Sequence, residues 1–329
     1  MKIATARRTG AVLAAAALSL TAACGGSSST SSGDASALSL QIIAPAAVGG
    51  GWDSTSRKAQ AVLEKEKLVK GAEVVNVEGA GGTIGLARLA GMTGKGGTLM
   101  TMGLVMVGAV ETNKSSATLD DVTPIARLTS EQEAVVVPAD SPYKTLADLA
   151  AAWKQDPGAV SVAGGSAGGT DQILAGLLAQ AAGVDPKKVN YIAFSGGGEA
   201  LAAILGGKVS AGISGVSEFA DQVETGKMRA LAVSGSKRVE GFDAPTAKEA
   251  GLDVELENWR GFVAPKGLSD SDKKALTDTV QKMHDSQAWK DEMTANGWDD
   301  AYQPAEEFTA YLATEKTRIQ GVLADLGLV

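Results

Sequence analysis

The chain has 329 residues, of which 44% are hydrophobic and 21% are charged, so it can form a globular protein with more than one domain. Its formal net charge is −8 and no basic or aromatic cluster offsets it, which argues against nucleic acid as a partner. A single histidine and a single cysteine leave no zinc or transition-metal cluster, and neither a metal nor another cofactor is predicted.

Residues 1–23 have the features of an export signal. Lys2, Arg7 and Arg8 precede an apolar run, residues 11–23, that is too short to span a bilayer comfortably. The segment ends in L-T-A-A-C, which resembles the lipobox of bacterial lipoproteins and makes Cys24 the predicted lipid attachment site. An ordinary signal peptide with a cysteine at its cleavage site is the alternative. Residues 24–37, rich in glycine and serine, are predicted to form a flexible tether.

A strand, a glycine turn and a helix recur in this order along the chain. The clearest copy has a strand at residues 159–163, the turn A-G-G-S-A-G-G-T-D at residues 163–171 and a helix at residues 172–182. Further strands are predicted at residues 40–44, 73–77 and 189–194, each followed by a glycine turn and a helix that begins near residue 53, 84 or 199. Asp53 and Asp171 are interpreted as helix caps, which can also order the turns.

These turns predict a site for an anionic or polar ligand. Glycine turns leave backbone N–H groups uncovered at the positive ends of helices, so they suit a carboxylate or phosphate without a basic side chain. In an α/β sheet, such turns meet at the carboxyl ends of the strands. A single copy would be explained as an ordinary tight turn, but four copies favour a shared ligand. The chain has no P-loop, and residues 79–85 miss the dinucleotide-binding glycine register by one residue.

The remaining elements predict a mainly parallel sheet. Strands are expected at residues 98–104 and 133–137, with a loop at 120–124 and a crossing at 138–142. Thr145 begins a helix with Asp148 placed for a capping box, and Leu146, Leu149 and Trp153 share one face. Strands and helices then alternate to about residue 233. Residues 254–265 look like a return crossing, and helices follow at 269–286, 288–296 and 305–326. The acidic pairs at 120–121 and 299–300 are interpreted as solvated loop charges.

Several of these segments together resemble a known family over essentially all of the mature chain. They are A-P at residues 44–45 with G-G-G-W-D at 49–53, G-A-G-G-T-I-G at 79–85, G-L-V-M-V-G at 103–108, D-D-V-T-P-I-A-R at 120–127, residues 164–171, residues 194–199 and N-W-R-G at 258–261. In order and spacing, the set is similar to the substrate-binding proteins of tripartite tricarboxylate transporters, within the wider Bug family.

The resemblance implies an α/β fold of the two-lobed Venus-flytrap type, like type II periplasmic binding proteins, with each lobe a mainly parallel sheet flanked by helices. Residues 38–138 are then the first part of lobe 1, residues 139–258 are lobe 2, and residues 259–329 are the return crossing and the C-terminal helices of lobe 1. The family's carboxylate-binding loops fall on residues 45–53 and 166–171. The expected ligand-binding residues are Ala46, Gly49, Gly50, Gly51, Asp53, Gly82, Thr83, Leu104, Ser166, Ala167, Gly168, Thr170, Asp171, Ser195, Gly196, Gly197 and Arg260.

The resemblance implies a receptor rather than an enzyme. It would capture a small carboxylate, in this prediction a citrate-like tricarboxylate, and deliver it to membrane permease subunits. A dicarboxylate, an amino acid or an aromatic acid is the alternative ligand. The protein is expected to be a monomer, lipid-anchored to the outer face of the bacterial cytoplasmic membrane or periplasmic.

Arg260 raises two hypotheses of equal weight. Its guanidinium could hold a third carboxylate bidentately, so that Arg260→Ala would weaken binding of a tricarboxylate more than that of a dicarboxylate. Alternatively, Arg260 pairs with an acidic neighbour such as Glu257 and braces the crossing.

A function of another class is a serine hydrolase. G-G-S-A-G at residues 164–168 matches the G-x-S-x-G nucleophile elbow, and Ser166 follows a predicted strand. The single histidine, His284, is in an amphipathic helical pattern rather than in a loop after a strand, so a histidine on the helix surface is the preferred interpretation.

Overall fold

The computed structural model describes residues 38–329. The predicted signal peptide, Cys24 and the tether lie outside the described residues, so their roles stay predictions. Within residues 38–329, no helix combines the length and the hydropathy that a membrane span requires.

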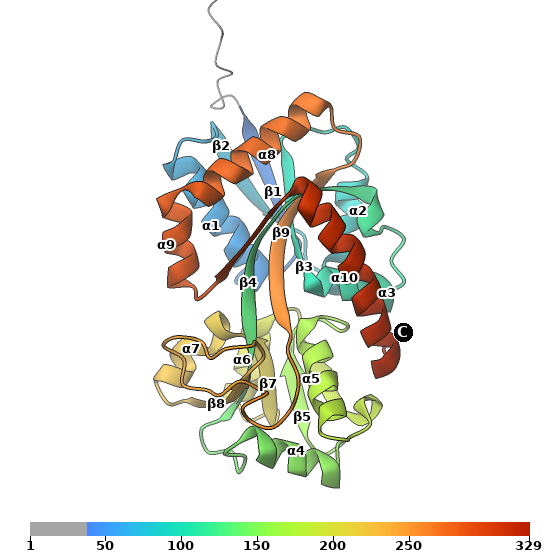
Figure 1. Cartoon of the computed structure of the whole chain (residues 1–329), viewed down its shortest axis with the longest axis vertical. Helices are drawn as coiled ribbons and strands as arrows, with labels where there is room; N and C mark the ends of the chain where they lie inside the picture. Colours follow the sequence, from blue (N-terminus) through green and yellow to red (C-terminus); the bar gives the residue numbers. More distant parts are fainter. Residues whose placement is uncertain (1–37) are drawn as a thin grey trace, which may run out of the picture. The chain divides into compact units, whose positions relative to one another are not determined.

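The first three strands of the sheet pair in parallel (Figure 1). β1 (Ser39–Ala44) lies between β2 (Gly71–Asn76) and β3 (Thr98–Gly103). The strands are followed by α1 (Gly51–Lys65), by the short η2 (Ala80–Gly82) with α2 (Thr83–Ala90), and by α3 (Leu104–Thr112). Parallel neighbours need a crossover connection, and the helices after β1 and β2 supply it. The strands predicted at residues 40–44, 73–77 and 98–104 are therefore confirmed.

The 17-residue strand β4 (Val122–Pro138) changes its pairing partners partway along. Its residues up to Gln132 pair with β9 (Glu257–Pro265), whereas those from Glu133 pair with β7 (Ala211–Gly215) and β8 (Met228–Val233). Figure 1 shows β4 and β9 side by side through the centre of the sheet. The loop predicted at residues 120–124 is wrong from Val122 onward. Pro124 fits in the strand because it lies at a register shift, where its missing N–H costs least.

The second part of the sheet is built around β5 (Ser161–Gly164), which pairs in parallel with β6 (Asn190–Ala193) and β7. The strands run β2-β1-β3-β9-β4-β7-β5-β6, and β8 and β10 (Asp299–Pro304) also pair with β4. Every antiparallel pair involves β4 or β9, so the sheet is mixed, whereas the sequence predicts a mainly parallel one; the parallel pairs come from the strand–helix–strand units. The predicted lobe boundaries after residues 138 and 258 stay predictions.

The helices begin close to where the sequence pattern predicts them. In α4 (Leu146–Gln155) the capping box is confirmed, because the Asp148 N–H donates to Thr145 Oγ1 at 3.1 Å and the Thr145 N–H donates to Asp148 Oδ2 at 2.9 Å. Trp153 is fully buried, as expected. The other helices are α5 (Thr170–Ala181), α6 (Gly197–Leu205), α7 (Val216–Glu224), α8 (Asp270–Asp285), α9 (Gln287–Ala295), α10 (Ala305–Leu326) and the short η3 (Leu119–Asp121) and η4 (Pro186–Lys188).

Helix α10 links the two parts of the sheet. It packs against α3, β4 and α5, and the Leu326 side chain near its end lies on Gly176 of α5. One continuous apolar cluster includes Leu86 of α2, Trp259 of β9, Phe308 of α10 and Leu178 of α5. The interpretation of residues 299–300 as loop charges is wrong, since these residues begin β10.

Candidate ligand-binding site

A cavity of about 380 Å³ lies where the glycine turns from both parts of the sheet meet. Its volume is in the range of small-molecule sites, about 300–1,000 Å³. The turns at the carboxyl ends of β1, β2, β5 and β6 form much of the wall, and β9 adds Asn258 and Arg260. The lining residues are Pro45, Ala46, Gly50, Gly51, Trp52, Gly79, Ala80, Gly81, Gly82, Val105, Asn113, Gly165, Ser166, Ala167, Asp171, Ala193, Phe194, Ser195, Gly196, Gly197, Glu199, Ser214, Glu218, Asn258 and Arg260.

Most of the predicted ligand-binding residues line this cavity. They are Ala46, Gly50, Gly51, Gly82, Ser166, Ala167, Asp171, Ser195, Gly196, Gly197 and Arg260. Six others are outside the lining: Gly49, Asp53, Thr83, Leu104, Gly168 and Thr170. Leu104 and Thr170 are fully buried, and the Thr83 hydroxyl donates to the Ala80 carbonyl. Whether a lining residue contacts ligand stays a prediction.

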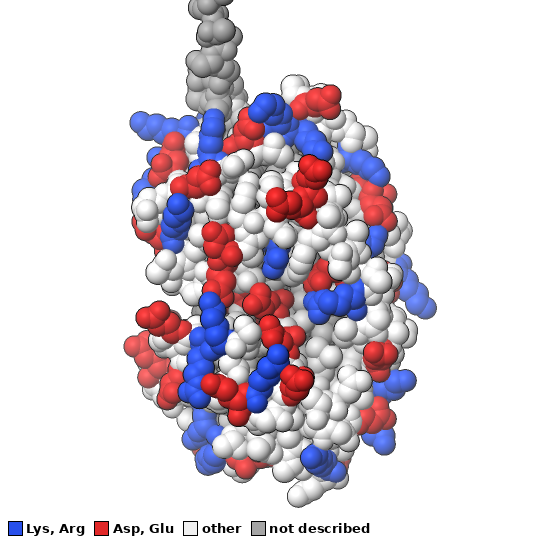
Figure 2. All heavy atoms as spheres, in the orientation of Figure 1, with Lys and Arg blue, Asp and Glu red and all other residues white. Residues whose placement is uncertain are grey.

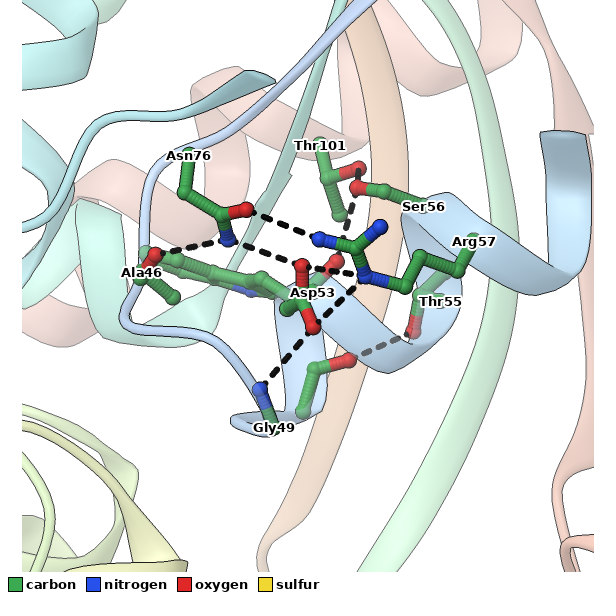
Figure 3. Close-up of polar contacts among 10 residues, drawn as sticks. Ala46, Gly49, Asp53, Thr55, Ser56, Arg57, Asn76 and Thr101 are labelled. Atoms are coloured by element: carbon green, nitrogen blue, oxygen red, sulfur yellow. Dashed lines mark hydrogen bonds and ion pairs between the residues drawn. The ribbon is translucent and has the colours of Figure 1, made fainter. Parts of the chain in front are cut away.

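The side chain of Asp53 holds the first glycine turn, residues 45–52, through hydrogen bonds (Figure 3). Helix α1 begins at Gly51 with Gly50 as its N-cap, so the interpretation of Asp53 as the cap is wrong. The carboxylate of Asp53 accepts hydrogen bonds from the Gly49 N–H at 2.9 Å and from Asn76 Nδ2 at 2.8 Å. It also forms an ion pair with Arg57 at 2.9 Å. Burial raises the pKa of Asp53, but the hydrogen bonds from Arg57, Gly49 and Asn76 outweigh it and lower the pKa below its ordinary value.

Two other turns are held by an acidic residue in the same way. The Gly165 N–H donates to Asp171 Oδ2 at 2.6 Å, and the Ser195 N–H donates to Glu199 Oε2 at 3.0 Å. Asp171 lies in the first turn of α5 after the N-cap Gly169, so it is not the cap either. These N–H groups are used within the protein. The starts of α1 and α6 line the cavity at Gly51, Trp52 and Gly197, and the first N–H groups of a helix have no acceptor inside it, so these helix starts remain the donors for a ligand.

Glycine is required where two charged side chains approach the cavity. A Cβ atom on Gly51 would lie 2.7 Å from Arg260 Nη2. A Cβ atom on Gly197 would overlap Glu218 Oε2. The absence of side chains at the starts of α1 and α6 therefore leaves room for Arg260 and Glu218 at the wall.

Arg260 forms a buried ion pair with Glu131 rather than with Glu257. Its Nη2 lies 2.7 Å from Glu131 Oε2, and the two side chains are 4% and 1% exposed. Glu131 of β4 pairs with Asn258 of β9, which places it diagonally across from Arg260 on one face. Glu257 is three residues from Arg260 along β9, so strand alternation turns it to the opposite face. The bracing hypothesis is therefore right about an ion pair and wrong about Glu257, while contact of Arg260 with ligand stays a prediction.

Carboxyl groups outnumber basic groups around Arg260. Burial, together with the charges of Asp171, Glu131 and Glu218, raises the pKa of Glu133 well above its ordinary value. Burial raises the pKa of Asp171 to about 6, despite the hydrogen bond from Gly165. Burial and the charge of Glu131 raise the pKa of Glu218 to about 7. Arg260 is the only basic residue in the cavity lining, whereas Asp171, Glu199 and Glu218 are all acidic.

The outer surface offers no substitute for these local charges on the face drawn in Figure 2. Lysine and arginine side chains there are interspersed with aspartate and glutamate, and no large area carries a single sign. The formal charge of −8 likewise does not attract an anion, so we expect groups in the cavity itself to hold an anionic ligand.

Among residues 38–329, both ring nitrogens of His284 contact aspartates, and neither is hydrogen-bonded to Ser166. Ser166 lines the cavity, but the ring nitrogens of His284 lie 3.1 Å from Asp285 Oδ1 and from Asp300 Oδ1. The imidazole also stacks on Tyr302, with 4.1 Å between ring centroids. His284 is 9% exposed, so its interpretation as a surface residue is wrong. Its contacts are with Asp285, Asp300 and Tyr302.

Sequence reasoning missed Glu131, Glu133, Ser214 and Glu218. The segment E-Q-E at residues 131–133 was a usable signal, because it places two acids on one face of a strand whose residues are otherwise mostly apolar. A further strand–glycine–helix unit, β7 followed by α7, leads to Glu218 in the first helical turn. Among the described residues, no three His, Cys, Asp or Glu side chains are placed to share a metal ion.

Comparison with known proteins agrees with this architecture. Residues 56–328 match the family described as "Tripartite tricarboxylate transporter family receptor". The chain is 26% identical over 293 residues to the UPF0065 protein in the gbd 5' region of Cupriavidus necator, covering 88% of each chain. It is also 26% identical over 298 residues to BugT of Bordetella pertussis, covering 88% of this chain and 89% of that protein.

Solved structures of related proteins have the same fold. MatC from Rhodopseudomonas palustris with bound malate has a TM-score of 0.78 at 26% identity, and a TctC solute binding protein from Polaromonas has a TM-score of 0.64 at 29% identity. Each comparison covers 87% of this chain and 98% of the other. The periplasmic binding protein BugD, at 22% identity and a TM-score of 0.80, supports the fold alone. These neighbours are two-lobed periplasmic binding proteins, so the predicted fold class is confirmed. The chain belongs to the tripartite tricarboxylate transporter receptor family.

Proposed function

We propose that this chain captures a small carboxylate between two lobes and delivers it to the membrane permease subunits of a tripartite transporter. The observation that carries the proposal is the convergence of the starts of α1, α5 and α6 on one cavity. Helix starts supply N–H donors and a positive potential to a carboxylate. Membership of the receptor family supports transport rather than catalysis, and permease subunits as partners.

Both proposed lobes contribute to the cavity rim. A Cβ atom on Gly196 would lie 3.8 Å from the Cα of Gly50, and one on Gly81 would lie 3.6 Å from the Cβ of Ser166. The turns after β1 and β6 therefore come close, and so do the turns after β2 and β5. A ligand that bonds to both sides stabilises the closed arrangement, because only that arrangement offers both sets of contacts.

The charges around the cavity favour a ligand with one or two carboxylates. The guanidinium of Arg260 is paired with Glu131, and the lining residues Asp171 and Glu218 would repel a third negative charge. MatC, a relative at 26% identity, holds malate, which has two carboxylates. A citrate-like tricarboxylate, predicted from the sequence, is the competing ligand.

A thermal-shift screen tests this function. The mature chain is heated with mono-, di- and tricarboxylates at matched ionic strength, because a ligand that binds the native state raises the midpoint of unfolding. We expect stabilisation by at least one mono- or dicarboxylate and less by citrate. Stabilisation by citrate above all others would restore the tricarboxylate prediction, whereas no effect from any carboxylate would refute the proposed function.

We also propose that Cys24 carries a lipid that tethers a monomeric receptor to the outer face of the membrane. The support is the lipobox-like sequence before Cys24 and the Gly/Ser-rich residues that follow it. Cys24→Ser should release soluble protein or leave an uncleaved precursor, measured by membrane fractionation. A fully processed Cys24→Ser protein that stays on the membrane would contradict the anchor.

A further inference from the structure

The acidic side of the cavity shares its one basic neighbour, Arg260, with Glu131. Asp171 and Glu218 line the cavity and accept from neutral donors: Asp171 from the Gly165 N–H at 2.6 Å and from its own backbone N–H, and Glu218 from the Ser214 hydroxyl at 3.2 Å. The charge of Asp171 is among the causes of the raised pKa of Glu218, so the two carboxyl groups are near enough to repel each other. Neither forms an ion pair among residues 38–329.

A fully buried carboxyl group lies behind this wall. Glu133 is 0% exposed, and neither of its side-chain oxygens has a hydrogen-bond partner in the described part of the chain. It is two residues from Glu131 in β4, so it points to the same face as the carboxylate that meets Arg260. The cluster thus holds the carboxyl groups of Glu131, Glu133, Asp171 and Glu218 around the single guanidinium of Arg260.

This excess of carboxyl groups favours a ligand that carries a cationic group. Buried charges need counterions, and without them the groups shift their pKa and take up protons. The pKa of Asp171 is raised to about 6, that of Glu218 to about 7, and that of Glu133 well above its ordinary value, burial being the largest cause in each case. Carboxyl groups with raised pKa values take up protons more readily, and a nearby cation would reverse that shift. Each carboxylate of a ligand adds to the negative charge of the cavity, and a positive group on the same ligand would offset it.

We propose that the natural ligand is a zwitterion whose carboxylate binds the helix starts and whose primary ammonium group faces Asp171 and Glu218. The proposal rests on the proposed function, since it names the class of carboxylate that the same cavity takes. An ammonium group supplies three donors in a compact volume and suits carboxylate oxygens. A metal ion fits less well, because no three acidic, histidine or cysteine side chains among the described residues are placed to share one.

Four related acids separate the contributions of the amine and of the second carboxylate. L-Glutamate and glutarate differ by the amine, and so do 4-aminobutyrate and butyrate, while glutamate and 4-aminobutyrate differ by a carboxylate. Calorimetric titration of the mature chain should show at least tenfold tighter binding of the amine-bearing member of a pair. Titration in buffers with different ionisation enthalpies should show proton release near pH 7, because a bound cation lowers the pKa of Glu218.

A variant assigns the effect to the acidic wall. Glu218→Gln keeps a side chain that can accept from Ser214 and should weaken glutamate binding about tenfold while leaving glutarate binding unchanged or tighter. Glu224→Gln, on the exposed end of the same helix, is the matched control and should change neither.

Three results would overturn the zwitterion: equal or tighter binding of the amine-free acids, proton uptake on binding, or failure of all four acids to bind. If none of the four binds but another carboxylate stabilises the chain in the thermal-shift screen, the proposed function stands and the zwitterion proposal fails. If no carboxylate of any kind binds, the proposed function fails with it.

Discussion

The ion pair between Arg260 and Glu131 makes the sharpest stability prediction. Arg260→Ala removes the only basic group of the cavity lining and leaves Glu131 beside the carboxyl groups of Glu133 and Glu218. Both members of the pair are almost completely buried, so water replaces little of the lost interaction. Removing one partner of a buried ion pair typically costs about 3–5 kcal/mol of unfolding free energy.

The loss should depend on pH. Without Arg260, the remaining acids should hold their protons more strongly in the folded than in the unfolded state. A carboxyl group whose pKa is higher in the folded than in the unfolded state lowers the unfolding free energy of the protein as the pH rises above the unfolded pKa. For glutamate, the unfolded pKa is 4.5. We therefore expect a loss of about 3 kcal/mol or more near pH 8 and a smaller loss near pH 5.

Urea unfolding followed by tryptophan fluorescence measures both values. The matched control is Arg238→Ala, which breaks the ion pair with Glu249 at 2.8 Å, where both side chains are about half exposed. That control should cost less than about 1 kcal/mol. Adding Glu131→Gln to Arg260→Ala should restore part of the loss, because a neutral amide needs no counterion. A loss for Arg260→Ala no greater than that of the control, or one independent of pH, would refute the reasoning.

Three further predictions follow from the site. Gly197→Ala should weaken carboxylate binding by about tenfold in calorimetry, because the new Cβ displaces Glu218; unchanged affinity would contradict the packing. Asp53→Asn should cost about 1 kcal/mol near pH 7, since Arg57 is 47% exposed. The pKa of Asp53 is lowered in the folded state, so its stabilisation is present above the unfolded value of 3.8 and is lost as the pH falls through the folded pKa. Acid unfolding curves of wild type and variant should therefore converge, and a constant gap would exclude this linkage. The raised pKa values of Glu133, Asp171 and Glu218 should make the wild type less stable as the pH rises above about 4.5, and Glu133→Gln should reduce this fall; equal falls for wild type and variant in urea unfolding between about pH 5 and pH 8 would disprove the role of Glu133.

Local patterns in the sequence correctly placed most of the elements that form the cavity. Alternating apolar residues followed by glycine and then by a 3.6-residue period predict β1 with α1 and β5 with α5 without knowledge of their neighbours. Because such turns lie at the carboxyl ends of parallel strands, their convergence on one cavity could also be expected. The capping box at Thr145 is equally local, since its partner Asp148 is three residues away.

The pairing of distant segments could not be predicted in this way. Residues 133–137, which end in a run of valines, are the only part of β4 that the sequence pattern identifies. The strand begins earlier, at Val122, because its residues up to Gln132 pair with β9. The strand β10 has little apolar character and exists because β4 pairs with it. Backbone pairing across more than a hundred residues leaves no local pattern, so both assignments depended on the tertiary structure.

The sequence by itself determined the glycine turns, the helix starts and the anion-binding character of their N–H groups, because these follow from residues adjacent in the chain. Only the tertiary structure decided the charge of the cavity. It paired Arg260 with Glu131 instead of Glu257, and it buried Glu133 behind the wall that Asp171 and Glu218 form. The effective charge of a carboxyl group depends on its solvent exposure and on neighbours from other strands and helices, and neither is encoded in its immediate sequence.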